Sequence, residues 1–97
     1  MAYEIRLTDH AREDFLALDA RWRSGVKAAM EAHLRHRPAK ESKSRIKRLR
    51  GLRQPQYRLR VDTIRVFYDI EPGHVNVLGI VPKERADEWL ARYGDTV

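Results

Sequence analysis

The sequence predicts an α+β fold, in which an N-terminal strand and an antiparallel helical hairpin pack on a small, mostly antiparallel sheet with a short C-terminal helix. Three observations lead to this prediction. An alternating apolar pattern opens the chain, two stretches of helical spacing follow, and valine- and isoleucine-rich segments alternate after residue 57. At 97 residues, the chain is predicted to form one domain spanning residues 1–97.

The first three elements are predicted from periodicity and capping residues. Ala2–Leu7 alternates apolar and polar residues, as a half-exposed strand does. Thr8 or Asp9 can cap a helix that follows. The apolar positions of this helix are Phe15, Leu18 and Trp22.

A second helix is predicted to start at Ser24, which can cap it, and to end before Pro38. Its apolar positions are Val26, Met30 and Leu34. Residues 38–56 show no regular pattern, although Ile46–Leu49 can form a short strand or one helical turn.

The C-terminal half has a clear strand pattern. Tyr57–Val61 and Ile64–Ile70 flank Asp62-Thr63, and Val75–Val81 forms a third strand after a Pro-Gly turn. Lys83–Tyr93 is predicted to be the C-terminal helix.

Positive charge is concentrated in the middle of the chain. The net charge is +6, and residues 35–65 hold twelve Lys or Arg but two acidic residues. Such a segment favours a polyanionic partner, most simply nucleic acid, over a solvated surface that serves solubility. The densest run comprises Lys43, Arg45, Lys47, Arg48, Arg50, Arg53, Arg58 and Arg60.

Several classes of protein are excluded by composition. The chain has no cysteine, so it has neither a disulfide nor a cysteine-ligated metal centre. It has no apolar run of about 20 residues and no signal-peptide pattern at its N-terminus. We therefore expect a cytoplasmic protein without membrane contact.

Strand pairing is predicted to gather three arginines on one face. If Asp62-Thr63 is a two-residue hairpin loop, Arg60 lies opposite Arg65, and Arg58 shares their face. Like charges that face each other across strands repel. An anion-binding site explains this pattern better than arginines that merely extend into water.

The same face is predicted to carry apolar residues. Phe67 can form a floor for a nucleobase, whereas Leu78 and Ile80 are expected to be core under the C-terminal helix.

These segments together resemble the RelE/ParE toxin superfamily of bacterial type II toxin–antitoxin systems. The resemblance covers nearly the whole chain and implies the α+β fold described above. The segments that carry it are Arg48–Gly51, Tyr57–Val61, Ile64–Ile70, Val75–Val81 and Lys83–Trp89.

The resemblance implies a metal-independent endonuclease that cuts mRNA on the ribosome and needs no cofactor. Arg58 and Arg65 would stabilise charge on the scissile phosphate. Arg60 stands where RelE-type enzymes place a lysine proposed as general base, and Lys83 where they place an arginine that protonates the leaving oxygen. Trp89 stands near a tyrosine that orients a base.

Tyr93 is a further candidate to contact RNA, and the basic run Lys43, Arg45, Lys47, Arg48, Arg50 and Arg53 is expected to attract the RNA backbone. Arg60 departs from the family pattern, because a guanidinium is a poor proton acceptor at neutral pH. Two alternatives therefore stay open: a ParE-like DNA gyrase inhibitor, and a non-catalytic RNA-binding or decayed toxin. The family also implies an antitoxin encoded by a neighbouring gene.

Overall fold

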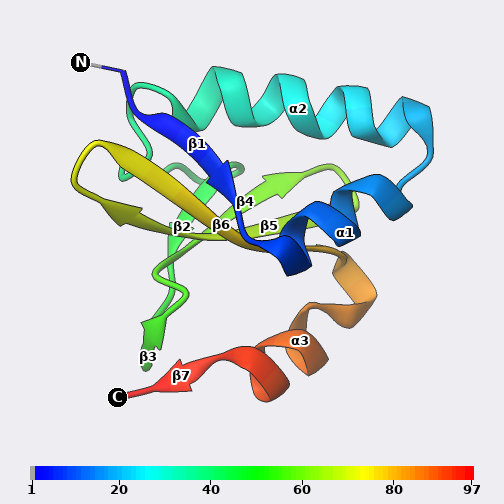
Figure 1. Ribbon diagram of the computed structural model, residues 1–97. Coiled ribbons are helices and arrows are strands. Elements are labelled where there is room, and N and C mark those ends of the chain that lie inside the picture. Colours follow the sequence, from blue (N-terminus) through cyan, green and yellow to red (C-terminus); the bar gives the residue numbers. More distant parts are fainter. Residues whose placement is uncertain (1) are drawn as a thin grey trace.

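A five-stranded sheet in the order β1-β6-β5-β4-β2 forms the centre of the molecule (Figure 1). The computed structural model describes residues 2–97. Its strands are β1 (Glu4–Leu7), β2 (Ile46–Arg48), β3 (Leu52–Gln54), β4 (Tyr57–Val61), β5 (Ile64–Glu71), β6 (His74–Pro82) and β7 (Asp95–Thr96). Its helices are α1 (Asp9–Ala17), α2 (Ala20–Leu34), the short 3-10 helix η1 (Lys83–Arg85) and α3 (Ala86–Tyr93).

The predicted fold class is confirmed. β1 pairs in parallel with β6, and the other neighbours in the large sheet are antiparallel. Figure 1 shows α1 and α2 on one side of the sheet and α3 on the other. Among residues 2–97, no helix is long and apolar enough to cross a membrane.

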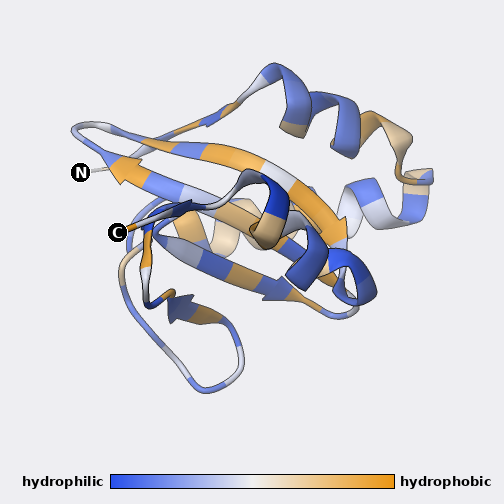
Figure 2. Cartoon of the chain, turned by 90° about the horizontal axis from the view of Figure 1, so that it is seen from below, coloured by the Kyte–Doolittle hydropathy of each residue, from blue (hydrophilic) through white to orange (hydrophobic). Residues whose placement is uncertain are grey.

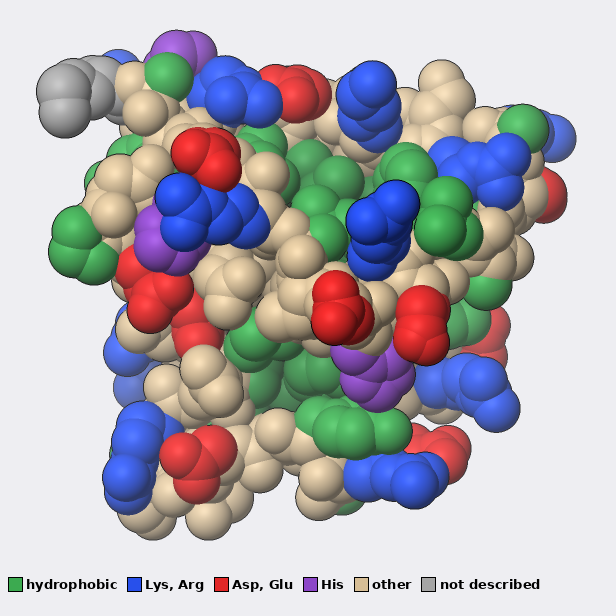
Figure 3. Space-filling model, viewed as in Figure 1, with side chains coloured by type: hydrophobic (Ala, Val, Ile, Leu, Met, Phe, Trp, Pro, Cys, Tyr) green, Lys and Arg blue, Asp and Glu red, His purple; other side chains and the backbone are tan. Residues whose placement is uncertain are grey.

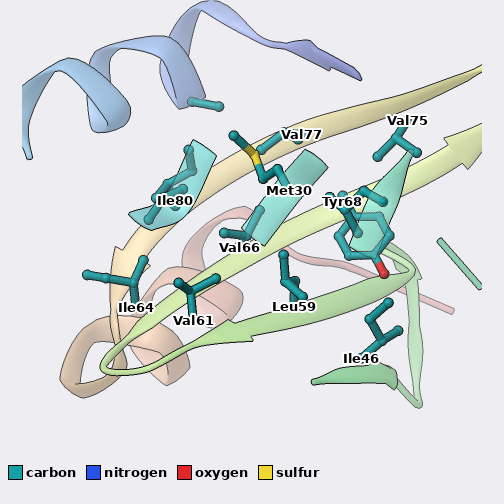
Figure 4. Packing of buried hydrophobic residues seen from close by; sticks show 13 residues of the cluster. Met30, Ile46, Leu59, Val61, Ile64, Val66, Tyr68, Val75, Val77 and Ile80 are labelled. Atoms are coloured by element: carbon teal, nitrogen blue, oxygen red, sulfur yellow. The ribbon is translucent and has the colours of Figure 1, made fainter. Parts of the chain in front are cut away.

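The main core lies between the sheet and the two N-terminal helices (Figure 4). α2 contributes three buried residues at helical spacing, Val26, Met30 and Leu34. The buried Tyr68 hydroxyl donates to the Pro38 carbonyl at 2.7 Å, which fixes the chain that leaves α2. Burial raises the pKa of Tyr68, so this hydroxyl stays a donor.

Each of the first two helices starts at a side-chain cap. Thr8 accepts from the Ala11 amide at 3.1 Å, and Asp19 accepts from the Trp22 amide at 3.0 Å. Thr8 was one of the predicted caps. The predicted cap at Ser24 is wrong, because Asp19 starts α2 earlier and places both Trp22 and Ser24 inside it.

The hairpin of β4 and β5 has the predicted register. Val61 pairs with Ile64 and Arg60 with Arg65, and the same register continues to the pair of Tyr57 with Tyr68. Alternating side chains therefore put the apolar set under α2 and the arginines on the α3 side. Figure 2 shows this alternation as hydrophobic and hydrophilic bands along the strands.

A β-bulge at Leu78 changes the predicted face of one residue. Phe67 pairs with Gly79 but Tyr68 pairs with Val77, so Leu78 is the extra residue on β6. Ile80 therefore packs in the main core, and its predicted place on the arginine side is wrong. The Ile80 amide, close to the bulge, donates to the Asp14 carboxylate of α1 at 3.0 Å. A side chain from outside the sheet thus provides its hydrogen-bond acceptor.

A smaller core lies on the α3 side and consists of Phe67, Val81 and Trp89. The rings of Phe67 and Trp89 stack with centroids 4.8 Å apart and planes 10° apart. The indole of Trp89 also lies against Gly79, where a Cβ would overlap the ring. Glycine at this position therefore allows α3 to approach the sheet.

The C-terminus is held by a second, two-stranded sheet of β3 and β7. The buried Asp69 carboxylate ties the chain after β3 to β5, because it accepts from Gln54 Nε2 at 2.6 Å and from the Gln56 amide at 2.7 Å. The pairing of β3 with β7 joins residues about 40 positions apart, directly after α3 ends at Tyr93. The irregular sequence of residues 38–56 did not predict it.

Gly79→Ala should lower the free energy of unfolding by about 1–3 kcal/mol, because the new methyl group forces Trp89 away from the sheet. Gly25→Ala is the matched control. Gly25 lies in α2 with open space around its Cα, so alanine there should stabilise the protein by about 0.5–1 kcal/mol. Urea unfolding followed by circular dichroism measures both. Equal effects of the two substitutions would contradict the packing described here.

Candidate nucleic-acid interface

A basin of about 360 Å³ opens between the sheet and α3. Each of four elements contributes one cation to it: β2, β4, β5 and η1. Asp87 of α3 is the acidic residue among those that line it. We call this hollow the arginine basin; its cations are Lys47, Arg58, Arg65 and Lys83, and its apolar wall is formed by Leu49, Phe67, Ala86 and Leu90.

Arg65 is the most buried of these cations, with 7% of its surface exposed. Its Nη1 donates to the Asp62 carbonyl at 2.7 Å and to the Ile64 carbonyl at 3.1 Å. These bonds hold one edge of the guanidinium against the β4–β5 turn. Burial lowers the pKa of Arg65, and the cations Arg58 and Arg60 lower it further.

Arg58 is half-buried, and its Nε is fully buried with no hydrogen-bond partner. An unpaired buried N–H on a cation is costly, so this position calls for an acceptor. Burial lowers the pKa of Arg58, and the neighbouring Arg60 adds to the effect. Both perturbations would be relieved by an anion in the basin.

Lys83 is attached to the same turn that holds Arg65. Its amide donates to the Thr63 carbonyl at 2.7 Å. The β4–β5 turn therefore positions Arg65 through Asp62 and Lys83 through Thr63, so the two cations face one basin from different elements.

The basin cations have no ion-pair partner within residues 2–97. The Lys and Arg side chains of this range that form ion pairs are Arg6, with Glu4, and Arg35, with Glu31. On the face shown in Figure 3, acidic and basic side chains lie next to one another. In the arginine basin, four cations face one exposed carboxylate, that of Asp87.

Arg60 lies outside the group of residues that line the basin, although it shares their face of the sheet. It pairs with Arg65 across the hairpin, and its side chain is exposed. Its backbone amide donates to the Arg45 carbonyl at 2.8 Å. Arg60 therefore stands at the rim, where it affects the basin through its charge.

The structure places two aromatic candidates in the core. Phe67 is fully buried and Trp89 is 8% exposed, and each covers the other. Little of either ring is exposed to meet a nucleobase, and the roles expected of Phe67 and Trp89 stay predictions. Both rings attach α3 to the sheet.

The predicted RNA-contacting residues do not form one surface. Lys47 lines the arginine basin, whereas Arg48 lies over the Tyr57 ring, with its guanidinium carbon 5.0 Å from the ring centroid. Tyr93 is 45% exposed and meets the ring of His10 edge-on at 4.9 Å, outside the arginine basin. The other basic residues of the run are exposed: Lys43, Arg45, Arg50 and Arg53.

Sequence reasoning missed two members of the basin. The sequence analysis expects Lys47 only to attract the RNA backbone, and it gives Asp87 no role. A signal for Lys47 was present in the possible strand Ile46–Leu49, because neighbouring side chains of a strand point to opposite faces. The structure confirms that strand at Ile46–Arg48 and pairs Lys47 with Arg58. Asp87 could be placed only once α3 was known to cross this face.

The basin chemistry is that of cations rather than of a metal centre. Its side-chain donors can hold two or more oxygens of a phosphate, and Lys83 can give up a proton. Within residues 2–97, no group of three or more His, Cys, Asp or Glu is placed to hold a metal ion.

Comparison with solved structures shows which fold this is. A chain of the archaeal RelE–RelB complex from Pyrococcus horikoshii OT3 superposes with a TM-score of 0.70 and 19% identity, covering 88% of this chain and 99% of that one. A chain of the toxin–antitoxin complex RelBE2 from Mycobacterium tuberculosis gives 0.62 and 24%, covering 84% and 99%. The YoeB dimer from Staphylococcus aureus gives 0.61 and 16%, covering 79% and 92%.

The chain therefore has the fold of RelE and YoeB toxins, as the resemblance in sequence implied. No protein-family model matches the sequence, and no curated protein matches it significantly.

Arg60→Gln should raise the free energy of unfolding by roughly 0.5 kcal/mol at low salt, because it removes a like charge opposite Arg65. The gain should shrink as salt screens the repulsion. Arg12→Gln, at an exposed position on α1, should change stability little at either salt concentration. Thermal unfolding at two ionic strengths tests this prediction. A destabilised Arg60→Gln protein would show that the arginines are not in conflict.

Proposed function

We propose that this chain is a cytoplasmic toxin of the RelE/ParE superfamily that cleaves mRNA on the ribosome without a metal ion. The observation that carries the proposal is the Arg58 Nε, which is buried and unpaired beside the buried Arg65 in a basin of four cations. A phosphate would supply the negative charge that these four cations lack. The RelE-like fold supports the same reading.

The proposed reaction is attack of a ribose 2′-hydroxyl on the adjacent phosphate. The bond from the 2′-oxygen to phosphorus forms as the bond to the 5′-oxygen breaks. Arg58 and Arg65 stabilise the negative charge that grows on the non-bridging oxygens, because their donors are in place before the reaction. Lys83 gives a proton to the departing 5′-oxygen.

The 2′-hydroxyl proton must leave by a different route. Arg60 is a guanidinium at the rim and is too weak a base to take it. Asp87 is the carboxylate among the lining residues, so the proton passes to Asp87 or to water. A carboxylate is a modest base, and we therefore expect slow cleavage.

A second candidate function is RNA binding without cleavage, and the lack of a strong base in the basin supports it. A basin with four cations and no strong proton acceptor can bind RNA without turnover. The protein would then block the ribosome by occupancy, and mRNA would remain intact.

The proposed partners are the ribosome with its mRNA and an antitoxin encoded by a neighbouring gene. The similar structures from Pyrococcus horikoshii OT3 and Mycobacterium tuberculosis are a RelE–RelB complex and a toxin–antitoxin complex, respectively. An acidic segment of the antitoxin would supply the counter-charge that Arg58 and Arg65 lack.

Arg65→Ala should reduce mRNA cleavage by about 10²–10³-fold, because it removes a preformed donor to the phosphate. Arg58→Gln should have a similar effect and keeps most of the side-chain volume. Mapping of mRNA 5′ ends after induced expression measures the cleavage.

Arg12→Ala, which removes an exposed charge on α1, should retain full cleavage. Circular dichroism confirms that each variant is folded. Folded Arg58→Gln protein with wild-type cleavage would overturn the proposed reaction. Translation arrest with uncut mRNA by the wild-type protein would favour the non-catalytic candidate.

A further inference from the structure

A second cationic hollow of about 330 Å³ lies between the end of α2 and the segment that leads into β2. All of its ionisable lining residues are basic, and its apolar part is formed by Ala32 and Ile46. We call it the helix-side basin; its polar lining residues are His33, His36, Arg37, Lys40, Ser42 and Arg45.

The charge of the helix-side basin is not neutralised by the residues that the structure describes. Arg37, Lys40 and Arg45 form no ion pair within residues 2–97. A helix C-terminus attracts cations in its last turn, which can account for His33. Lys40 and Arg45 lie beyond that turn, so the helix dipole does not explain their convergence.

A hydroxyl donor is also available in this basin. Ser42 Oγ accepts from the Arg45 amide at 3.0 Å and from the Ile46 amide at 3.4 Å. Its lone pairs face the backbone, which leaves its O–H free to donate. The basin thus offers a hydroxyl, two guanidinium groups and an ammonium group to an anion.

The two basins meet at the edge strand β2. Arg45 lines the helix-side basin and Lys47 lines the arginine basin. Their Cα atoms are two residues apart on extended chain, which is about 7 Å. Because β2 is the last strand of the five-stranded sheet, no further strand separates the two hollows.

The outer edge of β2 is already occupied by its own chain. The Ser42 amide donates to the Ile46 carbonyl at 3.0 Å, and Glu41 Oε1 accepts from the Arg48 amide at 2.8 Å. A partner protein that adds a strand here would have to break these bonds. A ligand that crosses this edge therefore needs no backbone pairing, and its contacts with the basic side chains must outweigh repulsion from the Glu41 carboxylate.

We propose that the helix-side basin is a second phosphate-binding site for RNA, and that one single strand crosses β2 and occupies both basins. The inference rests on the RNA ligand of the proposed function and adds a site remote from the chemistry. The apolar lining gives the sugar or base of the bound nucleotide a contact surface.

The test is the salt dependence of RNA binding, measured by fluorescence anisotropy with 2′-O-methyl RNA, which cannot undergo 2′-hydroxyl attack. Arg37→Ser/Lys40→Ser removes two exposed cations from the helix-side basin. For an RNA of about 16 nucleotides, the slope of log K against log salt should fall in magnitude by about 1.4. For an RNA of about 4 nucleotides, which occupies the arginine basin alone, the slope should not change.

Arg12→Ser/Arg21→Ser is the matched control. It removes the same charge from exposed positions in α1 and in the first turn of α2, where Arg21 lies about 20 Å along the helix from Leu34, and should leave both slopes unchanged. Arg45→Ser is an independent single substitution that should lower the slope by about 0.7 with the long RNA.

The outcomes separate this inference from the proposed function. If Arg58→Gln weakens binding but the Arg37/Lys40 and Arg45 variants do not, the second site is wrong and the RNA-binding site stands. If Arg58→Gln also has no effect, the arginine basin does not bind RNA, and the proposed function fails with it. If the Arg37/Lys40 variant loses affinity for an acidic partner protein and keeps its affinity for RNA, the helix-side basin is a protein-docking surface and the inference is overturned.

Discussion

The register of the β4–β5 hairpin is the constraint on which the rest of this structure depends. A two-residue turn pairs Val61 with Ile64, and from there every second side chain enters the main core. A slip by one residue would bury the arginines and expose the valines. The same turn holds Arg65 through the Asp62 carbonyl and Lys83 through the Thr63 carbonyl. One local feature thus sets both the core and the candidate site.

The clustering of three arginines on one face of this hairpin lowers the free energy of unfolding of the protein without a ligand. Burial lowers the pKa of Arg58 and of Arg65; the charge of Arg60 lowers both further, and Arg58 also lowers the pKa of Arg65. A domain of this size buries a modest core, so such a conflict uses a noticeable part of its stability. An anion that binds the folded state would return that free energy by mass action. The two proposed partners, RNA and an acidic segment of an antitoxin, would both supply such an anion.

Much of the fold could be predicted because its signals are local. The alternation of Tyr57–Val61 and the two-residue turn were sufficient for the register and for the shared face of the arginines. The bulge on β6 was missed although Gly79 marks it, since an isolated glycine within a strand often accompanies a bulge. Asp19 and Ser24 are both good caps, and local sequence alone did not rank them.

The site was less predictable because it depends on where α3 crosses the sheet. Arg58 and Arg60 look equivalent in sequence, yet only Arg58 lines the basin under α3. From sequence, Trp89 could be an exposed ring that contacts RNA. In the structure its indole packs against Phe67 and Gly79. The pairing of β3 with β7, which holds the far end of α3, joins segments about 40 residues apart and has no periodic signal.

The central claim is that the cations of the arginine basin, Arg58 and Arg65 among them, receive a phosphate. Nitrogen-15 NMR of the arginine Nε–H groups tests this directly during titration with a short 2′-O-methyl RNA. The account predicts that the Arg58 and Arg65 signals shift and exchange more slowly with solvent. The Nε1–H of Trp89, which is also buried and unpaired but belongs to the core, should stay in place. Saturating RNA binding that leaves the Arg58 signal unmoved would contradict the account.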